Sequence, residues 1–284
     1  MSLDPVVDPR SLVSPEERSK VVLVDARSGP DARQRFEAGH LEGAVHVDLD
    51  SDLAAHPADP SQGGRHPLPA PHDLARVLAW LGIHSSKRVV VYDDKGGANA
   101  AARFWWMLRA TGHTRAQVLD GGYDAAVAAG IPVVSGPSEG SEQTTTPIGG
   151  WLSPGADLDE VARAASSPER LVIDVRAPAR YRGDEDPFDP HPGHIPGAVN
   201  VPFATNLGPD GRFLSKEELA AKYRAVLGDR APSDVIVSCG SGVTACHTLL
   251  AMERAGLGGA KLYVGSFSEW SRSGRPVAKG EEPG

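Results

Sequence analysis

Short runs of aliphatic residues alternate along the chain with longer segments that have helical spacing. The runs are three to five residues long and rich in Val, Ile and Leu, which is typical of strands buried on both faces of a parallel sheet. Strands that alternate with helices in this way predict an α/β fold, with helices flanking each parallel sheet. The predicted strands are 21–25, 89–92, 117–119, 171–174, 235–238 and 261–264, and the predicted helices are 71–81, 100–110, 216–227 and 243–255.

The same order of motifs occurs twice, so the chain contains an internal repeat. Residues 21–27 (VVLVDAR) resemble 171–176 (LVIDVR), and the turn 39–45 (GHLEGAV) resembles 193–199 (GHIPGAV). The offset between matching motifs varies from 144 to 154 residues, which is about half the chain. A period of this size predicts two similar domains rather than a solenoid.

The two copies are separated by a segment rich in Ser, Thr, Gly and Pro. This segment has no apolar periodicity, as is typical of a linker. We therefore predict an N-terminal domain over 1–134, a linker over 135–150 and a C-terminal domain over 151–284.

Composition and charge exclude several classes of protein. The 284 residues carry a formal net charge of −8 without a block of Lys and Arg, so a nucleic-acid partner is not expected. The longest aliphatic run, 21–24, is far too short for a membrane span, and the N-terminus has no signal-peptide pattern. Two cysteines provide neither a disulfide framework nor a four-ligand zinc site. These features predict a cytoplasmic protein that does not bind a membrane.

The candidate nucleophile is Cys239, which directly follows the predicted strand 235–238. The next residues, Gly240-Ser-Gly242, lead into the helix predicted to begin near Val243. Ligand sites of α/β folds lie at the carboxyl ends of parallel strands. Main-chain amides of a glycine loop, together with a helix N-terminus, stabilise an anion. We therefore expect this loop to favour the thiolate of Cys239.

The alternative for Cys239 is a small buried side chain with a packing role, as many free cysteines have. The glycine loop favours the functional interpretation, whereas Cys246 lies within the helical pattern and is interpreted as a packing residue. Cysteine phosphatases need an arginine six residues after the cysteine to hold phosphate, and here that position is Ala245. The loop therefore favours a softer target such as sulfur.

The loop Cys239-Gly-Ser-Gly-Val-Thr-Ala245 resembles the active loop of the tandem-domain rhodanese family, in its 3-mercaptopyruvate sulfurtransferase branch. Further motifs that match this family are 103–107 (RFWWM), 119–122 (LDGG), 193–198 (GHIPGA) and 268–270 (SEW). The resemblance implies two rhodanese-like domains, of which only the second has the catalytic cysteine. Asp93 or Asp94 occupies the matching place in the first copy.

The resemblance also implies roles for individual residues. Arg180 matches the arginine that holds the anionic substrate, and Ser241 matches a serine thought to act with His66 and Asp50. Such a Ser–His–Asp set could move protons as pyruvate enolate leaves. The implied catalytic residues are Cys239, Ser241, His66 and Asp50, and the implied substrate-binding residues are Arg180, Gly240, Gly242, Val243 and Thr244.

Two features concern the sulfur donor and point in opposite directions. The mercaptopyruvate branch usually has a second substrate arginine before the 193–198 turn, and here His191 is near that place. Thiosulfate-preferring relatives tend to have Arg and Lys where this chain has Gly240 and Ser241, which argues against thiosulfate.

The predicted function is therefore transfer of sulfur from 3-mercaptopyruvate, through a persulfide on Cys239, to a thiol or cyanide acceptor. A thioredoxin-like protein is one candidate thiol, and no metal or organic cofactor is expected. The alternatives are a thiosulfate sulfurtransferase with the same mechanism, and a sulfur-carrier or redox-sensing protein without turnover.

Overall fold

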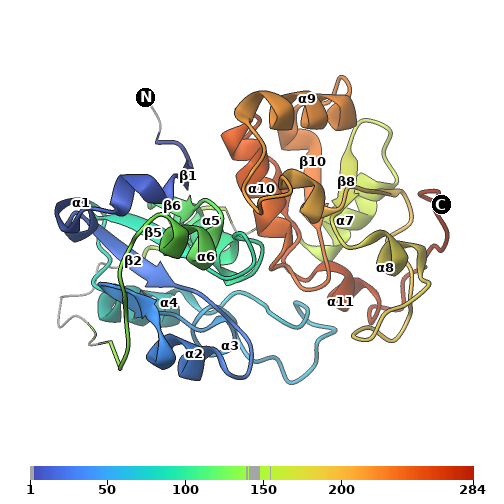
Figure 1. The fold of residues 1–284 in the computed structure, drawn as a ribbon. Helices are drawn as coiled ribbons and strands as arrows, with labels where there is room; N and C mark the ends of the chain where they lie inside the picture. Colours follow the sequence, from blue (N-terminus) through green and yellow to red (C-terminus); the bar gives the residue numbers. More distant parts are fainter. Residues whose placement is uncertain (1–2, 139, 141–147, 154) are drawn as a thin grey trace. The chain divides into compact units, whose positions relative to one another are not determined.

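The computed structural model describes residues 3–138, 140, 148–153 and 155–284, which form two compact units (Figure 1). The first unit contains residues 1–55, 69–154 and 209–213, and the second contains 56–68, 155–208 and 214–284. Residues 56–68 therefore pack with the second unit although they lie in the first half of the sequence. Residues 139 and 141–147 of the predicted linker lie outside the described residues, and the linker and domain boundaries stay a prediction.

A five-stranded parallel sheet forms the centre of the first unit. Its apolar strands are buried, as their Val- and Leu-rich sequences predict. The strand order is β1 (Val6–Val7), β6 (Ala116–Leu119), β5 (Arg88–Tyr92), β2 (Val21–Asp25) and β4 (Ala44–His46). A separate antiparallel pair joins β3 (His40–Leu41) to β7 (Val133–Val134).

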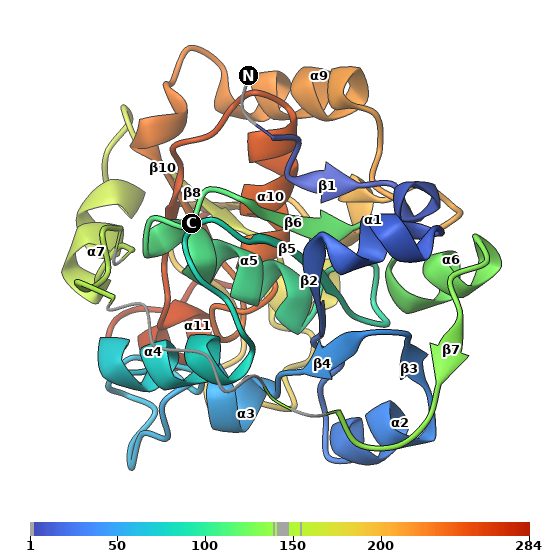
Figure 2. The ribbon, with the colours of Figure 1, turned by 90° about the vertical axis from the view of Figure 1, so that its left-hand side faces the viewer.

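Helices cover both sides of the first sheet. In Figure 2, α4 and α5 lie on one side of it and α2 and α6 lie on the other. The α-helices are α1 (Pro15–Ser19), α2 (Ala32–Ala38), α3 (Leu49–Asp52), α4 (Pro71–Trp80), α5 (Ala100–Ala110) and α6 (Gly122–Ala128), and a 3-10 turn, η1, spans Pro9–Leu12.

The second unit has a four-stranded parallel sheet, which lies between α7 and α10 in Figure 2. Its strand order is β11 (Lys261–Leu262), β10 (Val235–Ser238), β8 (Leu171–Asp174) and β9 (Ala198–Asn200). Its α-helices are α7 (Leu158–Ala165), α8 (Pro178–Arg182), α9 (Lys216–Leu227), α10 (Ala245–Arg254) and α11 (Ser266–Trp270). Two 3-10 turns, η2 and η3, span Phe203–Asn206 and Pro232–Asp234.

The internal repeat is visible in buried ion pairs at equivalent places of the two sheets. Asp25, at the end of β2, binds Arg27, and Asp174, at the end of β8, binds Arg176. Each arginine also donates to a glycine carbonyl, at 2.7 Å in both units. In each copy the buried aspartate and the buried arginine are thus each other's partner, as buried charges require.

The predicted fold class is confirmed, and all six predicted strands are present within two residues of their predicted ends. Helices α5 and α9 have the predicted bounds, whereas α10 begins at Ala245 instead of Val243. Among the residues that the structure describes, no helix combines the length and apolarity needed to cross a bilayer.

Candidate active site

Cys239 leaves the second sheet at the carboxyl end of β10. The register pairs Ser238 with Asp174, so β10 and β8 end at the same edge. Cys239 is 1% exposed and has a free thiol. Its backbone N–H donates to Ser266 Oγ at 3.1 Å, and the same oxygen lies 3.9 Å from Cys239 Sγ. The first residue of α11 therefore holds the backbone of Cys239 and contacts its thiol.

The predicted loop connects this cysteine to α10. Gly242 has φ +75°, and a side chain there would clash with the Val264 carbonyl oxygen, so only glycine fits. The carbonyl groups of Val243 and Thr244 accept hydrogen bonds from the N–H groups of residues 246 and 247, in the first turn of α10. The predicted support of the thiolate by loop amides stays a prediction.

The equivalent loop of the first unit encloses a carboxylate. The N–H of Ala26 donates to the Tyr92 carbonyl, as the N–H of Val175 donates to the Ser238 carbonyl, so Asp93 is the counterpart of Cys239. Its carboxylate accepts four backbone N–H groups at 2.8–3.2 Å, from Lys95, Gly97, Asn99 and Ala101. Burial raises the pKa of Asp93, although these hydrogen bonds lower it. The first loop thus encloses the Asp93 carboxylate at the place where the second loop begins with the Cys239 thiol.

Ser241 and His66 are brought together within the second unit. Ser241 Oγ lies 2.9 Å from His66 Nδ1, a hydrogen bond whose direction depends on the histidine tautomer. His66 belongs to residues 56–68 of this unit. Asp50 lies in α3 of the first unit, and its part in the predicted set stays a prediction.

Residues 63–65 are fixed against the N-terminal turn of α11. The Gly63 N–H donates to Glu269 Oε1 at 2.8 Å, and the Arg65 N–H donates to Ser268 Oγ at 3.1 Å. Gly64 has φ +80°, and a Cβ there would clash with the Gly265 carbonyl oxygen. This close approach places Arg65 and the following histidine beside the loop of Cys239.

Arg180 is half-buried and belongs to an ion-pair cluster around two buried aspartates. Its Nη2 donates to Asp186 Oδ1 at 3.0 Å and lies 3.5 Å from Asp189 Oδ2. Its Nη1 lies 3.2 Å from the position that a Cβ of Gly240 would take. The guanidinium therefore borders the predicted loop.

A second guanidinium, that of Arg65, lies at the same place. Its Nη2 is also 3.2 Å from the Cβ position of Gly240, and its Nη1 forms an ion pair with Asp189. The sequence interpretation did not select Arg65, and the available signal was its position directly before His66. Nor did it select Ser266, although residues 265–267 are the repeat counterpart of 121–123.

Comparison with known proteins shows to which family the chain belongs. The model of the Rhodanese-like domain family matches residues 8–129 and 157–273. The chain belongs to the rhodanese-like family. The predicted family and its two-domain fold are thereby confirmed.

Relatives of this rhodanese-like protein are named as sulfurtransferases. It is 42% identical over 252 residues to the probable 3-mercaptopyruvate sulfurtransferase of Pseudomonas aeruginosa, covering 87% of this chain and 86% of that one. It is 38% identical over 267 residues to the putative thiosulfate sulfurtransferase SseB of Mycobacterium tuberculosis, covering 92% and 91%. The structure of 3-mercaptopyruvate sulfurtransferase from Leishmania major superposes with a TM-score of 0.81 at 30% identity, covering 95% of this chain and 75% of that one.

The other cysteine of the rhodanese-like protein has a different environment. Cys246 is fully buried in α10, and its Sγ donates to the Gly242 carbonyl at 3.4 Å. This contact fits the packing role expected for Cys246.

His191 lines a surface hollow of about 380 Å³ in the second rhodanese unit, together with Arg275 and Lys279. None of the predicted site residues lines this hollow. The guanidinium beside Arg180 at Gly240 is that of Arg65. The second guanidinium beside Gly240 therefore belongs to Arg65 and not to the segment before the 193–198 turn.

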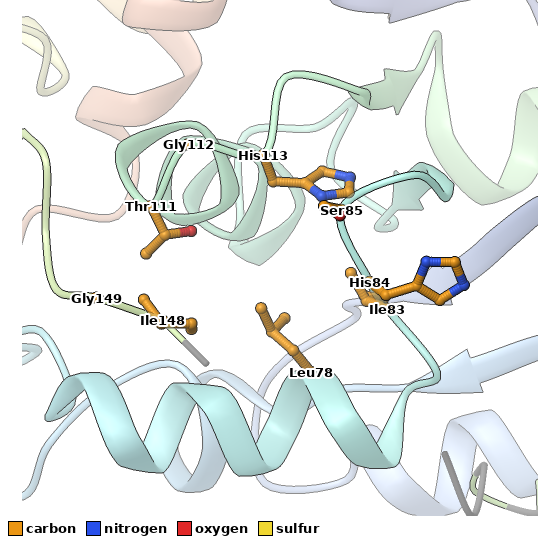
Figure 3. Close-up of a pocket in the computed structure, with 9 residues that line it drawn as sticks. All are labelled: Leu78, Ile83, His84, Ser85, Thr111, Gly112, His113, Ile148 and Gly149. Atoms are coloured by element: carbon orange, nitrogen blue, oxygen red, sulfur yellow. The ribbon is translucent and has the colours of Figure 1, made fainter. Parts of the chain in front are cut away.

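A small cavity of about 110 Å³ lies in the first rhodanese unit (Figure 3). Leu78, Thr111 and Ile148 point toward one another across it, whereas the ring of His84 points away. Burial lowers the pKa of His113, which also lines it. Its lining contains no thiol and none of the predicted site residues.

Proposed function

We propose that this rhodanese-like protein is a sulfurtransferase that takes sulfur from 3-mercaptopyruvate and holds it as a persulfide on Cys239. The observation that carries the proposal is a thiol at a strand end, followed by Gly240 with two guanidiniums beside it and by Ser241 paired with His66. Relatives named as 3-mercaptopyruvate sulfurtransferases, 33–42% identical over most of the chain, support the donor.

The proposed first step breaks the carbon–sulfur bond of the donor. The Cys239 thiolate attacks the donor sulfur, an S–S bond forms, and the electron pair of the broken bond leaves on carbon as the enolate of pyruvate. The enolate takes one proton to give pyruvate. Cyanide or a thiol then removes the outer sulfur, which regenerates the thiolate.

The polar groups around the loop have distinct proposed roles. Arg180 binds the donor's carboxylate, since a permanent cation suits a carboxylate. Ser241 and His66, joined by their hydrogen bond, deliver the proton to the enolate, with Asp50 as the predicted third member. Backbone amides of Gly240, Gly242, Val243 and Thr244 stabilise charge on the attacking and transferred sulfur.

The test of this proposal is replacement of each cysteine in turn. We expect Cys239→Ser to abolish formation of pyruvate and thiocyanate from mercaptopyruvate and cyanide, because the nucleophile is lost. Cys246→Ser is the matched control and should keep at least half of the wild-type rate. Incubation with donor alone should add one sulfur atom to the intact mass of wild type and of Cys246→Ser, but not of Cys239→Ser. Equal loss of activity in both variants would contradict the assignment of a single nucleophile.

Thiosulfate is the second candidate donor, favoured by the 38% identity to the Mycobacterium tuberculosis protein named for it. Rates with mercaptopyruvate and thiosulfate measured side by side decide between the donors. A protein that gains sulfur but releases none to an acceptor would instead be a carrier. The acceptor, including a thioredoxin-like one, and the cytoplasmic location stay predictions.

A further inference from the structure

We propose that the surface hollow beside His191 in the second rhodanese unit binds a phosphate ester, at a place separate from the loop of Cys239. Its volume of about 380 Å³ is within the range of about 300–1,000 Å³ that is typical of small-molecule sites. One water fills roughly 30 Å³, so this space can hold an organic group as well as a phosphate. The residues that give this basic hollow its chemistry are His191, Pro192, Ser271, Arg275, Val277 and Lys279.

The lining of the basic hollow is cationic, although the whole chain is acidic. Arg275 and Lys279 bring two positive charges, and the imidazole of His191 has at least one N–H donor in either protonation state. No Asp or Glu is among the described residues that line the hollow, whereas the chain has a formal net charge of −8. A local excess of positive charge of this kind attracts anions.

Both cations have donors available for a ligand. The side chain of Lys279 is exposed and forms no ion pair or hydrogen bond with the part of the chain that the structure describes. Arg275 Nη2 pairs with Asp159, but this carboxylate is 70% exposed, and an ion pair with so exposed a partner is weak. The Nε and Nη1 of Arg275 remain free to donate, and the ring of Trp270, 5.6 Å from the guanidinium carbon, orients the side chain.

Ser271 gives an independent sign of a missing ligand. It lines the hollow and is only 2% exposed, yet its Oγ has no hydrogen-bond partner among the described residues. Its backbone N–H is already used, because it donates to the Phe267 carbonyl at 2.9 Å. Buried polar groups are nearly always hydrogen-bonded, so an unpaired hydroxyl at the wall of a hollow indicates that the hollow holds its partner.

The two chain segments that form the hollow are joined by their backbones. The His194 N–H donates to the Ala278 carbonyl at 2.9 Å, and the Ala278 N–H donates to the His194 carbonyl at 3.0 Å. Residues 191–192 and 275–279 therefore keep their separation without a ligand. Binding then requires little ordering of the backbone, which favours affinity.

The chemistry of the lining fits a phosphate ester better than a carboxylate. A phosphate monoester carries close to two negative charges near neutral pH and has three acceptor oxygens, which matches two cations, an imidazole and a hydroxyl. A carboxylate brings one charge and two oxygens. Pro192 and Val277 add apolar surface to the hollow, against which the organic part of an ester can pack.

Calorimetric titration with two probes tests the proposal and distinguishes an ester from free phosphate. Inorganic phosphate and phenyl phosphate are titrated separately into the wild type at low ionic strength, where screening is weak. We expect phenyl phosphate to bind about 10-fold more tightly, because its ring adds apolar contact. Equal affinities would overturn the assignment to an ester and leave free phosphate as the ligand, and absence of binding by both probes would refute the site.

Variants locate the binding in the basic hollow. We expect Lys279→Ala and Arg275→Ala each to weaken binding of phenyl phosphate about 10-fold, the effect of losing a hydrogen bond to a charged group. Arg224→Ala is the matched control, because Arg224 is an exposed cation of the same unit that does not line the hollow. Affinities of Lys279→Ala and Arg224→Ala within twofold of each other would overturn the proposal. Binding that is lost in Arg180→Ala but kept in Lys279→Ala would place the phosphate at the loop of Cys239 instead.

Ser271→Ala separates a binding role from a structural one. The hydroxyl that it removes is buried without a partner among the described residues, so the melting temperature without ligand should be unchanged or higher. Binding of phenyl phosphate should nevertheless be several-fold weaker, because the ligand loses a hydrogen bond. An affinity equal to that of the wild type would remove Ser271 from the site.

Discussion

Ser266 stands out among single residues because its backbone is strained next to the thiol. It has φ +50° and is the only non-glycine residue with positive φ among those described. It is fully buried, accepts from the Cys239 N–H and donates to the Tyr263 carbonyl at 2.8 Å. A left-handed conformation costs a residue with a side chain about 1–2 kcal/mol. The contact with Cys239 is a physical reason to keep serine there at that cost.

Replacement of Ser266 by glycine and by alanine separates strain from hydrogen bonding. Both changes leave the buried Cys239 N–H without its acceptor, so both should reduce sulfur transfer. Only glycine relieves the strain, so Ser266→Gly should exceed Ser266→Ala in free energy of unfolding by about 1–2 kcal/mol. Calorimetric melting with activity assays measures both effects. Identical melting temperatures would mean that the φ of Ser266 carries no strain.

Among the predicted site residues, Cys239 had a signal in its local sequence, whereas Arg180, His66 and Asp50 were given by the family resemblance. Cys239 lies between a strand and a glycine loop, so its position followed from its neighbours. Arg65 and Asp189 are 124 residues apart and meet only in the folded chain. No periodicity or spacing encodes such an encounter, and for that reason the sequence interpretation missed the pair.

Among the elements, strands of four or five residues were predicted well, whereas most of the shorter strands were not. β2, β8 and β10 have the predicted bounds because each is a run of buried aliphatic residues. β4 and β9 have three residues each and follow glycine turns, so their pairing depends on the neighbouring strand. Such edge strands are formed by tertiary hydrogen bonds more than by their own sequence.

Burial disfavours the charged form of Lys222, which lies in helix α9. Lys222 donates to Asn206 Oδ1 at 2.7 Å, and burial lowers its pKa from the usual 10.5 to about 8. Between these pH values the unfolded chain binds one more proton than the folded chain, so the contribution of Lys222 to stability rises with pH. Below pH 8 both states are protonated and the contribution is constant.

We therefore expect the free energy of unfolding of the wild type, relative to Lys222→Met, to rise between pH 8 and pH 10.5. Urea titrations at several pH values in and below this window measure the difference. The exposed Lys279, changed to Met, controls for loss of a lysine in general. A constant difference between wild type and Lys222→Met across the window would show that burial does not disfavour this ammonium.

At the scale of the whole molecule, the repeat predicted two similar folds but not how the sequence is shared between them. Copies of a motif show which segments are alike, and residues 56–68 belong to none of the repeated motifs. Their assignment to the second unit depends on contacts such as that of Gly63 with Glu269, 206 residues away. The active loop thus receives Arg65 and His66 from the first half of the sequence.

Gly64 allows this segment to reach the second unit, and its replacement tests how much the site depends on that contact. In Gly64→Ala the new Cβ would clash with the Gly265 carbonyl oxygen, so the segment must shift and carry Arg65 and His66 with it. We expect at least a 10-fold loss of kcat/KM for mercaptopyruvate, because the shift would misplace the guanidinium beside Gly240 and the histidine paired with Ser241. Gly43→Ala is the matched control, because Gly43 has a similar φ of +83° with no atom within 4 Å of its Cβ position. It adds the same backbone strain, about 1–2 kcal/mol, without a clash. Steady-state kinetics and melting of both variants distinguish the effects, and equal activity losses would place the cause in strain rather than in the position of residues 56–68.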